Sequence, residues 1–253
     1  MEEKIILEKI SKDFGDLKVI DGLDVEIRKN EFTIILGPSG CGKTTLIKIL
    51  AGLVKPDSGK VSIFGHSPEQ IRSMNKYGIV FQDKNLIRWR SVKQNIELPG
   101  EIIDKKYDAT RLLRIVGLRR YGNYYPDEIS VGMQQRVAIA RAIASSPEIL
   151  LLDEPFSSLD ELAREKLQID LLRIWNESKL TAIHVTHNIH EAAFLADRII
   201  ILSSKPSRMI ASIKINLPRP RSLSVLRSLR YHRYITRIRS LIKDEKQGYN
   251  CHS

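Results

Sequence analysis

The chain has 253 residues, of which 42% are hydrophobic and 28% charged, a composition typical of an ordinary globular protein. No run approaches 18 uncharged apolar residues, and the N-terminus has no basic segment followed by an apolar one, so we expect neither a membrane span nor a signal peptide. The two cysteines, Cys41 and Cys251, provide no disulfide framework and favour a reducing cytoplasm.

The net charge of +11 is concentrated at the C-terminal end. From Ser203 onward there are twelve lysines and arginines against two acidic residues, so ten of the eleven net charges lie in the last fifth of the chain. A basic region of this kind is compatible with nucleic acid, an anionic membrane surface, an acidic partner or simply a solvated face. Composition alone leaves these four possibilities open.

The first residues predict short strands over 4–10 and 23–27, where apolar and polar residues alternate. A turn over 13–16 separates them and contains Phe14. The Phe14 ring could stack on a nucleotide base, which is worth about 1–3 kcal/mol by analogy with nucleic-acid binding. Alternatively, it fills the edge of the sheet.

An apolar strand is predicted over 32–36 and a helix over 46–51, with a glycine-rich loop between them. Strand, loop and helix in this order are the context of a phosphate-binding P-loop. Glycines let several backbone N–H groups converge, and the helix N-terminus adds its positive dipole end. Lys43 would pair with the β- and γ-phosphates, and the Thr44 hydroxyl would bind Mg²⁺. The loop residues are Gly37, Pro38, Ser39, Gly40, Cys41, Gly42, Lys43, Thr44 and Thr45.

Strands are next predicted over 60–65 and 77–81, and Gln82 follows the second, where its amide could bind Mg²⁺ or hold a water molecule. Residues 84–146 then have the composition of an inserted helical subdomain, with Ser91 as the N-cap of one helix. Trp89 lies in the loop that opens this block. It either builds a small local core or offers a contact surface.

Further candidate ligand-binding and catalytic residues begin at Ser130. Ser130 fits the N-cap of a helix that Pro147 ends, and a helix start of this kind is also an anion site. An apolar strand over 148–154 ends in Asp153 and Glu154, on the edge where parallel sheets bind ligands. Asp153 could hold Mg²⁺ and Glu154 could act as general base, although a structural ion pair is the alternative.

A long helix over 159–178 and a strand over 180–186 follow, and His187 lies at the end of that strand, on the same edge as Glu154. Strands over 197–202 and 209–213 are predicted to form a hairpin that closes the sheet. The prolines make residues 217–221 irregular. We then expect a helix over 222–243, with arginines on one face and an apolar stripe on the other. The stripe consists of Tyr231, Tyr234, Ile235, Ile238, Leu241 and Ile242.

These motifs, in this order over residues 3–221, resemble the ATP-binding subunit of ABC transporters. The resemblance identifies a signature segment over 129–134, a D-loop over 157–160, a Q-loop glutamine and a switch histidine. It implies catalytic roles for Lys43, Gln82, Glu154 and His187. Nucleotide contacts are implied for Phe14, the P-loop residues, Ser130, Gly132, Gln134 and Asp160, and Mg²⁺ contacts for Thr44, Gln82 and Asp153.

A narrower resemblance to the nitrate, sulfonate and taurine importer subfamily rests on residues 81–92 and on Leu-Pro-Arg-Pro-Arg at 217–221. Two positions depart from the family pattern. Members of the subfamily usually have proline where Arg88 stands, and the family signature normally has glycine where Val131 stands. The branched valine adds bulk and restricts the backbone, so we expect weaker engagement of the signature segment.

The expected fold is α/β, a P-loop NTPase core with a mainly parallel sheet, an N-terminal antiparallel β region and the inserted helical subdomain. We predict an ATPase domain over 1–221, with residues 84–146 as the subdomain, and a basic helix and tail over 222–253. The resemblance implies ATP and Mg²⁺ as cofactors, and either a homodimer or a pair with another ATPase subunit, with ATP between the two subunits. It also implies a membrane permease as partner, an indirect solute-binding protein, and a place on the cytoplasmic face of the membrane.

Two other functions share part of this pattern. A soluble ABC-type ATPase could use the basic tail to bind nucleic acid, but such relatives carry two ATPase units or long coiled coils, and this chain has neither. We therefore expect no nucleic-acid partner. The ATPase of an exporter or of a lipid-handling system shares every catalytic motif and remains open.

Overall fold

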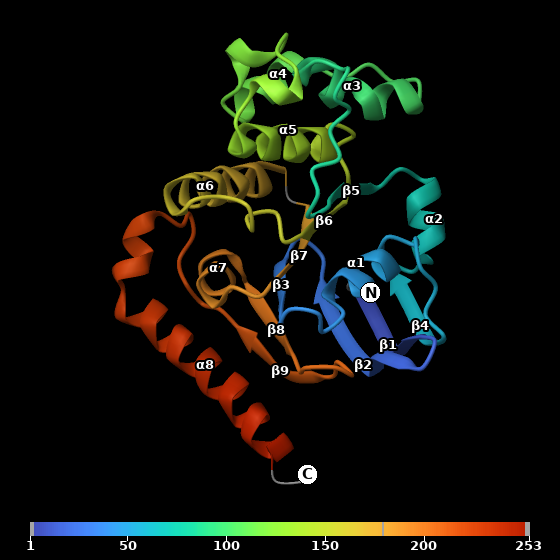
Figure 1. Ribbon diagram of the computed structural model, residues 1–253, viewed down its shortest axis with the longest axis vertical. Coiled ribbons are helices and arrows are strands. Elements are labelled where there is room, and N and C mark those ends of the chain that lie inside the picture. Colours follow the sequence, from blue (N-terminus) through green and yellow to red (C-terminus); the bar gives the residue numbers. More distant parts are fainter. Residues whose placement is uncertain (1–2, 179, 251–253) are drawn as a thin grey trace. The chain divides into compact units, whose positions relative to one another are not determined.

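The computed structural model describes residues 3–178 and 180–250, and the chain divides into two compact units (Figure 1). The first unit combines the chain up to Arg72 with the chain from Thr181 onward, and the second runs from Ser73 to Leu180. Each unit contains β-strands and helices, so the α/β class predicted from the sequence is confirmed.

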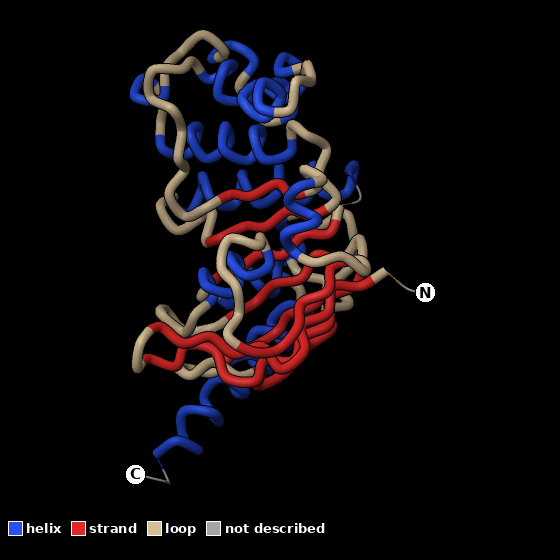
Figure 2. The backbone as a smooth tube through the Cα atoms, turned by 90° about the vertical axis from the view of Figure 1, so that its right-hand side faces the viewer, coloured by secondary structure: helices blue, strands red, loops and turns tan. Residues whose placement is uncertain are grey.

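An antiparallel sheet in the first unit consists of β1 (Lys4–Phe14), β2 (Leu17–Arg28) and β4 (Ser58–Ile63), in the order β2-β1-β4. These strands are among those drawn in red in Figure 2. Ile5, Leu7 and Ile10 of β1 are buried. Strands β1 and β2 are longer than the sequence predicted, because their polar outer residues still pair along the ladder from Lys4 to Phe14.

The parallel part of the first unit has β3 (Phe32–Leu36) between β7 (Thr181–Thr186) and β8 (Arg198–Leu202). Every residue of β3 and β7 is buried, as is usual for strands of a parallel sheet that is covered on both faces. Strand β9 (Met209–Lys214) pairs antiparallel with β8, so the predicted hairpin is confirmed. The helices here are α1 (Lys43–Leu50), α2 (Pro68–Ser73) and α7 (Ile189–Leu195).

The second unit pairs β5 (Tyr77–Val80) in parallel with β6 (Ile149–Asp153). Its helices are α3 (Val92–Ile102), α4 (Ala109–Ile115), α5 (Val131–Ile143) and α6 (Glu161–Ser178), with short 3-10 helices at Arg119–Tyr121 and Pro126–Glu128. A Cβ atom added at Gly78 of β5 would lie 2.2 Å from the carbonyl oxygen of Ala142, so glycine lets α5 approach this strand closely.

Helices α3, α4 and α5 fall within the predicted block 84–146, whose role as a subdomain remains a prediction. Ser91 caps α3 as expected, in a reciprocal capping box with Gln94. Trp89 is 80% exposed, so it builds no local core, and of the two interpretations the contact surface remains.

The C-terminal segment departs from the predicted single helix over 222–243. A 3-10 helix covers Leu223–Arg227, and α8 covers Leu229–Asn250. The break falls at Ser228, whose backbone is extended and whose hydroxyl accepts a hydrogen bond from the Tyr231 amide, which caps the second helix. Of the predicted apolar stripe, Tyr231, Ile235 and Ile238 are buried. None of the helices in the described residues is both long and apolar enough to span a bilayer.

Candidate functional site

The glycine-rich loop joins β3 to α1 in the first unit. The Gly37 amide donates to the Thr186 carbonyl over 3.3 Å, which attaches the loop to the neighbouring strand β7. Gly42 has φ of 108°, and a Cβ atom there would lie 2.8 Å from Cγ1 of Val19. Helix α1 begins at Lys43, three residues earlier than predicted, because the Leu46 amide already bonds the Gly42 carbonyl.

The Lys43 side chain is 4% exposed and turned into the loop. Its ammonium group donates to the Gly37 carbonyl over 3.0 Å and to the Pro38 carbonyl over 2.9 Å. A cation held inside a ring of backbone groups at a helix N-terminus fits a phosphate ligand. Thr44 is exposed beside it, as a ligand for a nucleotide-bound ion must be, whereas the Cys41 side chain is 1% exposed.

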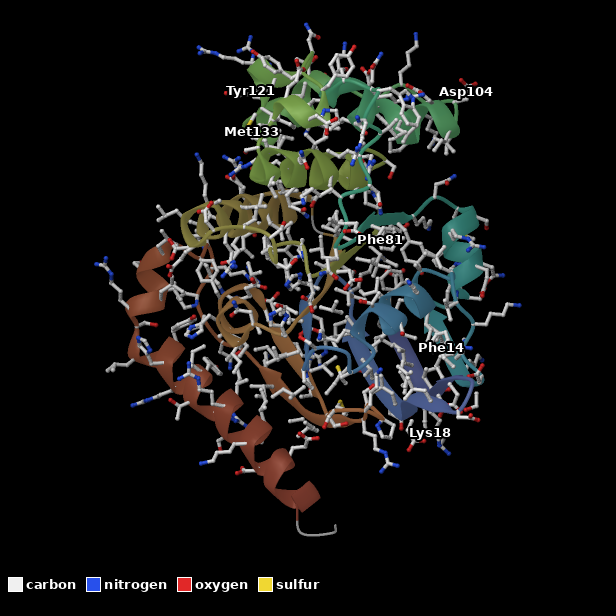
Figure 3. All side chains as sticks on the ribbon, in the orientation of Figure 1. Phe14, Lys18, Phe81, Asp104, Tyr121 and Met133 are labelled. Atoms are coloured by element: carbon white, nitrogen blue, oxygen red, sulfur yellow. The ribbon has the colours of Figure 1, made fainter. Side chains whose placement is uncertain are left out.

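Phe14 is the last residue of β1 and is 52% exposed (Figure 3). The Lys12 ammonium lies 5.5 Å from the centre of its ring and bonds Asp57 over 2.6 Å. Asp57 also accepts from the Asp13 amide, and these two contacts hold its pKa below the usual value. The ring is therefore half exposed beside the Lys12 ammonium, and its stacking on a base stays a prediction.

His187 follows β7 directly and is exposed. The residues on either side of it are fixed by hydrogen bonds: the Asn188 amide donates to the Thr186 hydroxyl over 3.0 Å, and that hydroxyl donates to Glu191 over 2.7 Å. Because Leu36 and Thr186 are neighbours in the sheet register, His187 and the P-loop leave the same edge of the first unit. The sequence analysis missed Asn188 as the N-cap of α7, although asparagine directly before an apolar run is a cap signal.

The second unit carries Gln82, Asp153 and Glu154 at the carboxyl ends of its two paired strands. Gln82 is exposed after β5, and Asp153, the last residue of β6, is 2% exposed. Glu154 has φ of 43°, in the left-handed region that a non-glycine residue rarely adopts. Such strain costs about 1–3 kcal/mol and concentrates at functional sites. No residue pattern around Glu154 predicts this backbone conformation.

The signature segment opens α5. The Ser130 hydroxyl accepts from the Met133 amide over 3.2 Å, so the predicted N-cap is confirmed. The side-chain amide of Gln134 donates through Nε2 to the Pro126 carbonyl over 2.9 Å and so stabilises the turn before the helix. Val131 exposes 45% of its surface at the first helical position. A Cβ atom at Gly132 would meet nothing nearer than Leu159 Cδ2 at 3.6 Å.

Asp160 has a structural task that the sequence analysis did not anticipate. Its carboxylate accepts from the Ala163 amide over 2.9 Å and so caps α6. Whether it also contacts nucleotide stays a prediction, as do the other nucleotide contacts. A cavity of the second unit of about 450 Å³ lies among α4, α5 and α6, and none of the predicted site residues lines it. The described residues contain no cluster of three His, Cys, Asp or Glu side chains that could enclose a metal.

Comparison with known proteins agrees with the motifs. A family model described as ABC transporter matches residues 20–157. An uncharacterized ABC transporter ATP-binding protein of Methanocaldococcus jannaschii is 40% identical over 97% of this chain and 93% of its own length. The aliphatic sulfonates import ATP-binding protein SsuB of Bacillus cereus is 44% identical over 84% of both chains.

Solved structures extend the likeness to the fold. The dimeric structure of a bacterial ABC transporter cassette superposes with a TM-score of 0.73 and 32% identity, covering 85% of this chain and 100% of the other. A post-hydrolysis state of the same cassette, bound to ADP and phosphate, gives the same TM-score with 31% identity.

Proposed function

Because the chain belongs to the ABC transporter family, whose cassettes are ATPases, we propose that it powers an importer of small solutes of the nitrate, sulfonate and taurine class. Two features support this solute class. One is the 44% identity to a sulfonate import protein over most of both chains, and the other is the Leu-Pro-Arg-Pro-Arg segment at 217–221. The cargo itself would be selected by a separate binding protein and by the permease.

The observation that carries the ATPase assignment is the P-loop of the first unit. The start of α1 and the buried Lys43 ammonium, which the Gly37 and Pro38 carbonyls hold within the loop, bring positive charge together at a helix N-terminus, as a phosphate-binding loop requires. We assign base stacking to Phe14, on the ground that its ring is half exposed at the end of β1. Lys43 would neutralise charge on the β- and γ-phosphates.

Hydrolysis needs a group that orients and deprotonates water, and we assign that role to Glu154. His187, exposed at the edge that also carries the P-loop, would contact the γ-phosphate. Both assignments rest on the family motif, and the strained backbone of Glu154 supports the first.

Mg²⁺ would be held by Thr44, Asp153 and Gln82. Hydroxyl, carboxylate and amide oxygens are the donors that this ion prefers, and one or two protein ligands beside the phosphates suffice for it. The exposed Thr44 hydroxyl at the start of α1 and the carboxylate at the end of β6 fit that requirement. When bound, the ion would supply charge neutralisation at the phosphates.

The dimeric cassette structure supports an assembly of two copies. We propose that each ATP lies between the P-loop of one copy and Ser130, Gly132, Gln134 and Asp160 of the other. The γ-phosphate then favours the closed dimer, and hydrolysis removes that preference. Gln82 and the exposed Trp89 would pass the motion to a permease on the cytoplasmic face of the membrane.

The experiment that tests this function is Glu154→Gln, with Glu177→Gln on the exposed end of α6 as control. We expect the first variant to lose about 10²- to 10⁴-fold in turnover, the range of a general base, while it still binds ATP and accumulates as a dimer. The control should keep wild-type turnover. Near-normal hydrolysis by Glu154→Gln would remove this residue from the role.

A further inference from the structure

Helix α8 packs against α7, the helix that begins two residues after His187. The contact is made by His190 in the first turn of α7. Its Nδ1 lies 3.0 Å from the Tyr231 hydroxyl, and its Nε2 lies 3.4 Å from Nη2 of Arg239. The Tyr231 hydroxyl also lies 3.4 Å from the backbone carbonyl oxygen of His190.

These contacts fix the protonation of the His190 ring. Arg239 can only donate, so Nε2 must accept, and the proton of the neutral imidazole must lie on Nδ1. Nδ1–H then donates to the Tyr231 hydroxyl, which in turn donates to the His190 carbonyl. All three bonds are satisfied in one tautomer of a neutral histidine. A protonated His190 would turn a donor toward Arg239 and lose that contact.

The segment 217–221 contacts the C-terminal end of α7. Arg221 donates to the carbonyls of Phe194 over 2.7 Å and of Ala196 over 2.8 Å. Arg219 donates to the carbonyl between them, that of Leu195, over 2.9 Å. Carbonyls at the end of a helix lack partners within the helix and carry its negative dipole end, so two guanidinium groups suit them.

Helix α7 is connected to His187 by side chains as well as by the chain. Asn188 caps the helix by accepting from the amides of His190 and Glu191, and Glu191 accepts from the Thr186 hydroxyl. Residues 186 and 188, on either side of His187, are thus fixed to the first turn of α7. A shift of that turn would therefore move the His187 backbone.

We propose that Arg219, Arg221, Tyr231 and Arg239 form a clamp that positions the switch histidine, with the first two at one end of α7 and the last two at the other end. The clamp gives a role to the Leu-Pro-Arg-Pro-Arg segment and to the C-terminal helix. Tyr231 and the arginines are positioning residues, since they act on the γ-phosphate only through His187. The inference rests on the proposed function of His187.

A dependence on pH follows from the neutral state of His190. The groups that face it are Arg239, His232 and Tyr231, all on α8, whereas the carboxylate of its chain neighbour Glu191 is bonded to Thr186. Partial burial first, and then the two basic neighbours, lower the pKa of His190. Wild-type kcat should fall at acidic pH as this ring takes up a proton.

The first test removes one hydroxyl with Tyr231→Phe. We expect kcat for ATP hydrolysis to fall about two- to tenfold, the factor that one hydrogen bond represents, with the Kd for ATP unchanged. Ser240→Ala is the matched control, because it also removes one hydroxyl from α8, but that hydroxyl donates to Asp244 of the same helix and not to α7. Equal kcat values in the two variants would overturn the clamp. A loss in Tyr231→Phe alone, with ATP binding intact, would support it.

The second test asks whether the effect passes through His187, by adding Tyr231→Phe to His187→Ala. If Tyr231 only positions His187, the double variant should turn over ATP at the rate of His187→Ala. A further loss equal to that of the single variant would show general structural damage and overturn the proposal. Full activity in His187→Ala would instead refute the proposed role of His187, so the two failures are distinguishable.

The third test uses the acidic limb of the pH–kcat profile. Arg239→Gln removes the charge that opposes protonation of His190, and the amide can accept as well as donate. We expect its acidic limb to shift or flatten relative to wild type. Arg237→Gln, an exposed change on the same helix, should leave the profile unchanged. Identical profiles for all three proteins would contradict the assignment of the neutral tautomer.

Discussion

The P-loop offers a matched pair of substitutions whose difference can be worked out from the structure. Gly40 and Gly42 both have positive φ, of 76° and 108°. A Cβ atom at Gly40 would meet nothing within 4 Å, whereas one at Gly42 would lie 2.8 Å from Cγ1 of Val19. Gly40→Ala therefore adds only backbone strain, and Gly42→Ala adds a steric overlap as well.

The expected losses in the free energy of unfolding follow from the backbone strain and the steric overlap. Left-handed backbone costs a non-glycine residue about 1–3 kcal/mol, so Gly40→Ala should lower the free energy of unfolding by about that amount. Overpacking adds about 1–3 kcal/mol, so the loss for Gly42→Ala should be about 2–6 kcal/mol. The overlap can be relieved only if Val19, which is 4% exposed, moves away from the loop.

The assay is urea unfolding of both variants in parallel, followed by ATP titration of the folded proteins. A double variant, Gly42→Ala with Val19→Ala, removes the overlapping methyl group. Val19→Ala should lower the free energy of unfolding less in the Gly42→Ala background than in the wild type, because in that background it also relieves part of the overlap. Equal stability of Gly40→Ala and Gly42→Ala would refute the close approach of the loop to Val19.

Three further predictions concern other parts of the chain. Val131→Gly should raise kcat severalfold in steady-state ATPase assays, because it removes the exposed branched side chain at the start of the signature helix; an unchanged or lower kcat would contradict this. Trp89→Ser should leave the ATPase rate of the purified subunit unchanged but reduce its copurification with a permease, and normal recovery of the complex would exclude Trp89 from the contact. The pKa of Asp57 is lowered by Lys12, so its stabilising effect is present above the unfolded-state pKa and is lost as pH falls through the folded-state value. Asp57→Asn should accordingly lower Tm at pH 7 and lower it less as the pH falls below the ordinary aspartate pKa of 3.8, and an equal loss at every pH would contradict the ion pair.

Much of the fold could be predicted because local patterns decide it. The short apolar stretch at 32–36, which a glycine-rich loop ends, indicates a buried strand, and Ser91 and Ser130 lie where a helix needs an N-cap. The break at Ser228 was missed because the apolar period continues through it, and a serine in a helix pattern is not by itself a stop.

The candidate site was predictable to the level of its residues but not of their contacts. The spacing of the motifs identifies Lys43, Glu154 and His187, but no sequence pattern predicts the left-handed backbone at Glu154. The contact of His190 with Tyr231 joins residues 41 positions apart and depends on how α8 packs. Arg221 belongs to a basic C-terminal region whose composition is also typical of a solvated surface. Its side chain is nevertheless buried against backbone carbonyls, and this burial lowers its pKa.

The central claim is that each catalytic centre is completed by a second copy of the chain, and mixing two inactive variants tests it most directly. Lys43→Met removes the P-loop charge, and Gly132→Asp places a carboxylate where the γ-phosphate of the opposite copy would lie. The substitution at Gly132 fits its own chain, where a Cβ atom stays 3.6 Å from its neighbours. The ATPase rate of the mixture should rise well above the sum of the separate rates, since the mixed dimer holds one intact site. A mixture that stays at that sum would contradict the account.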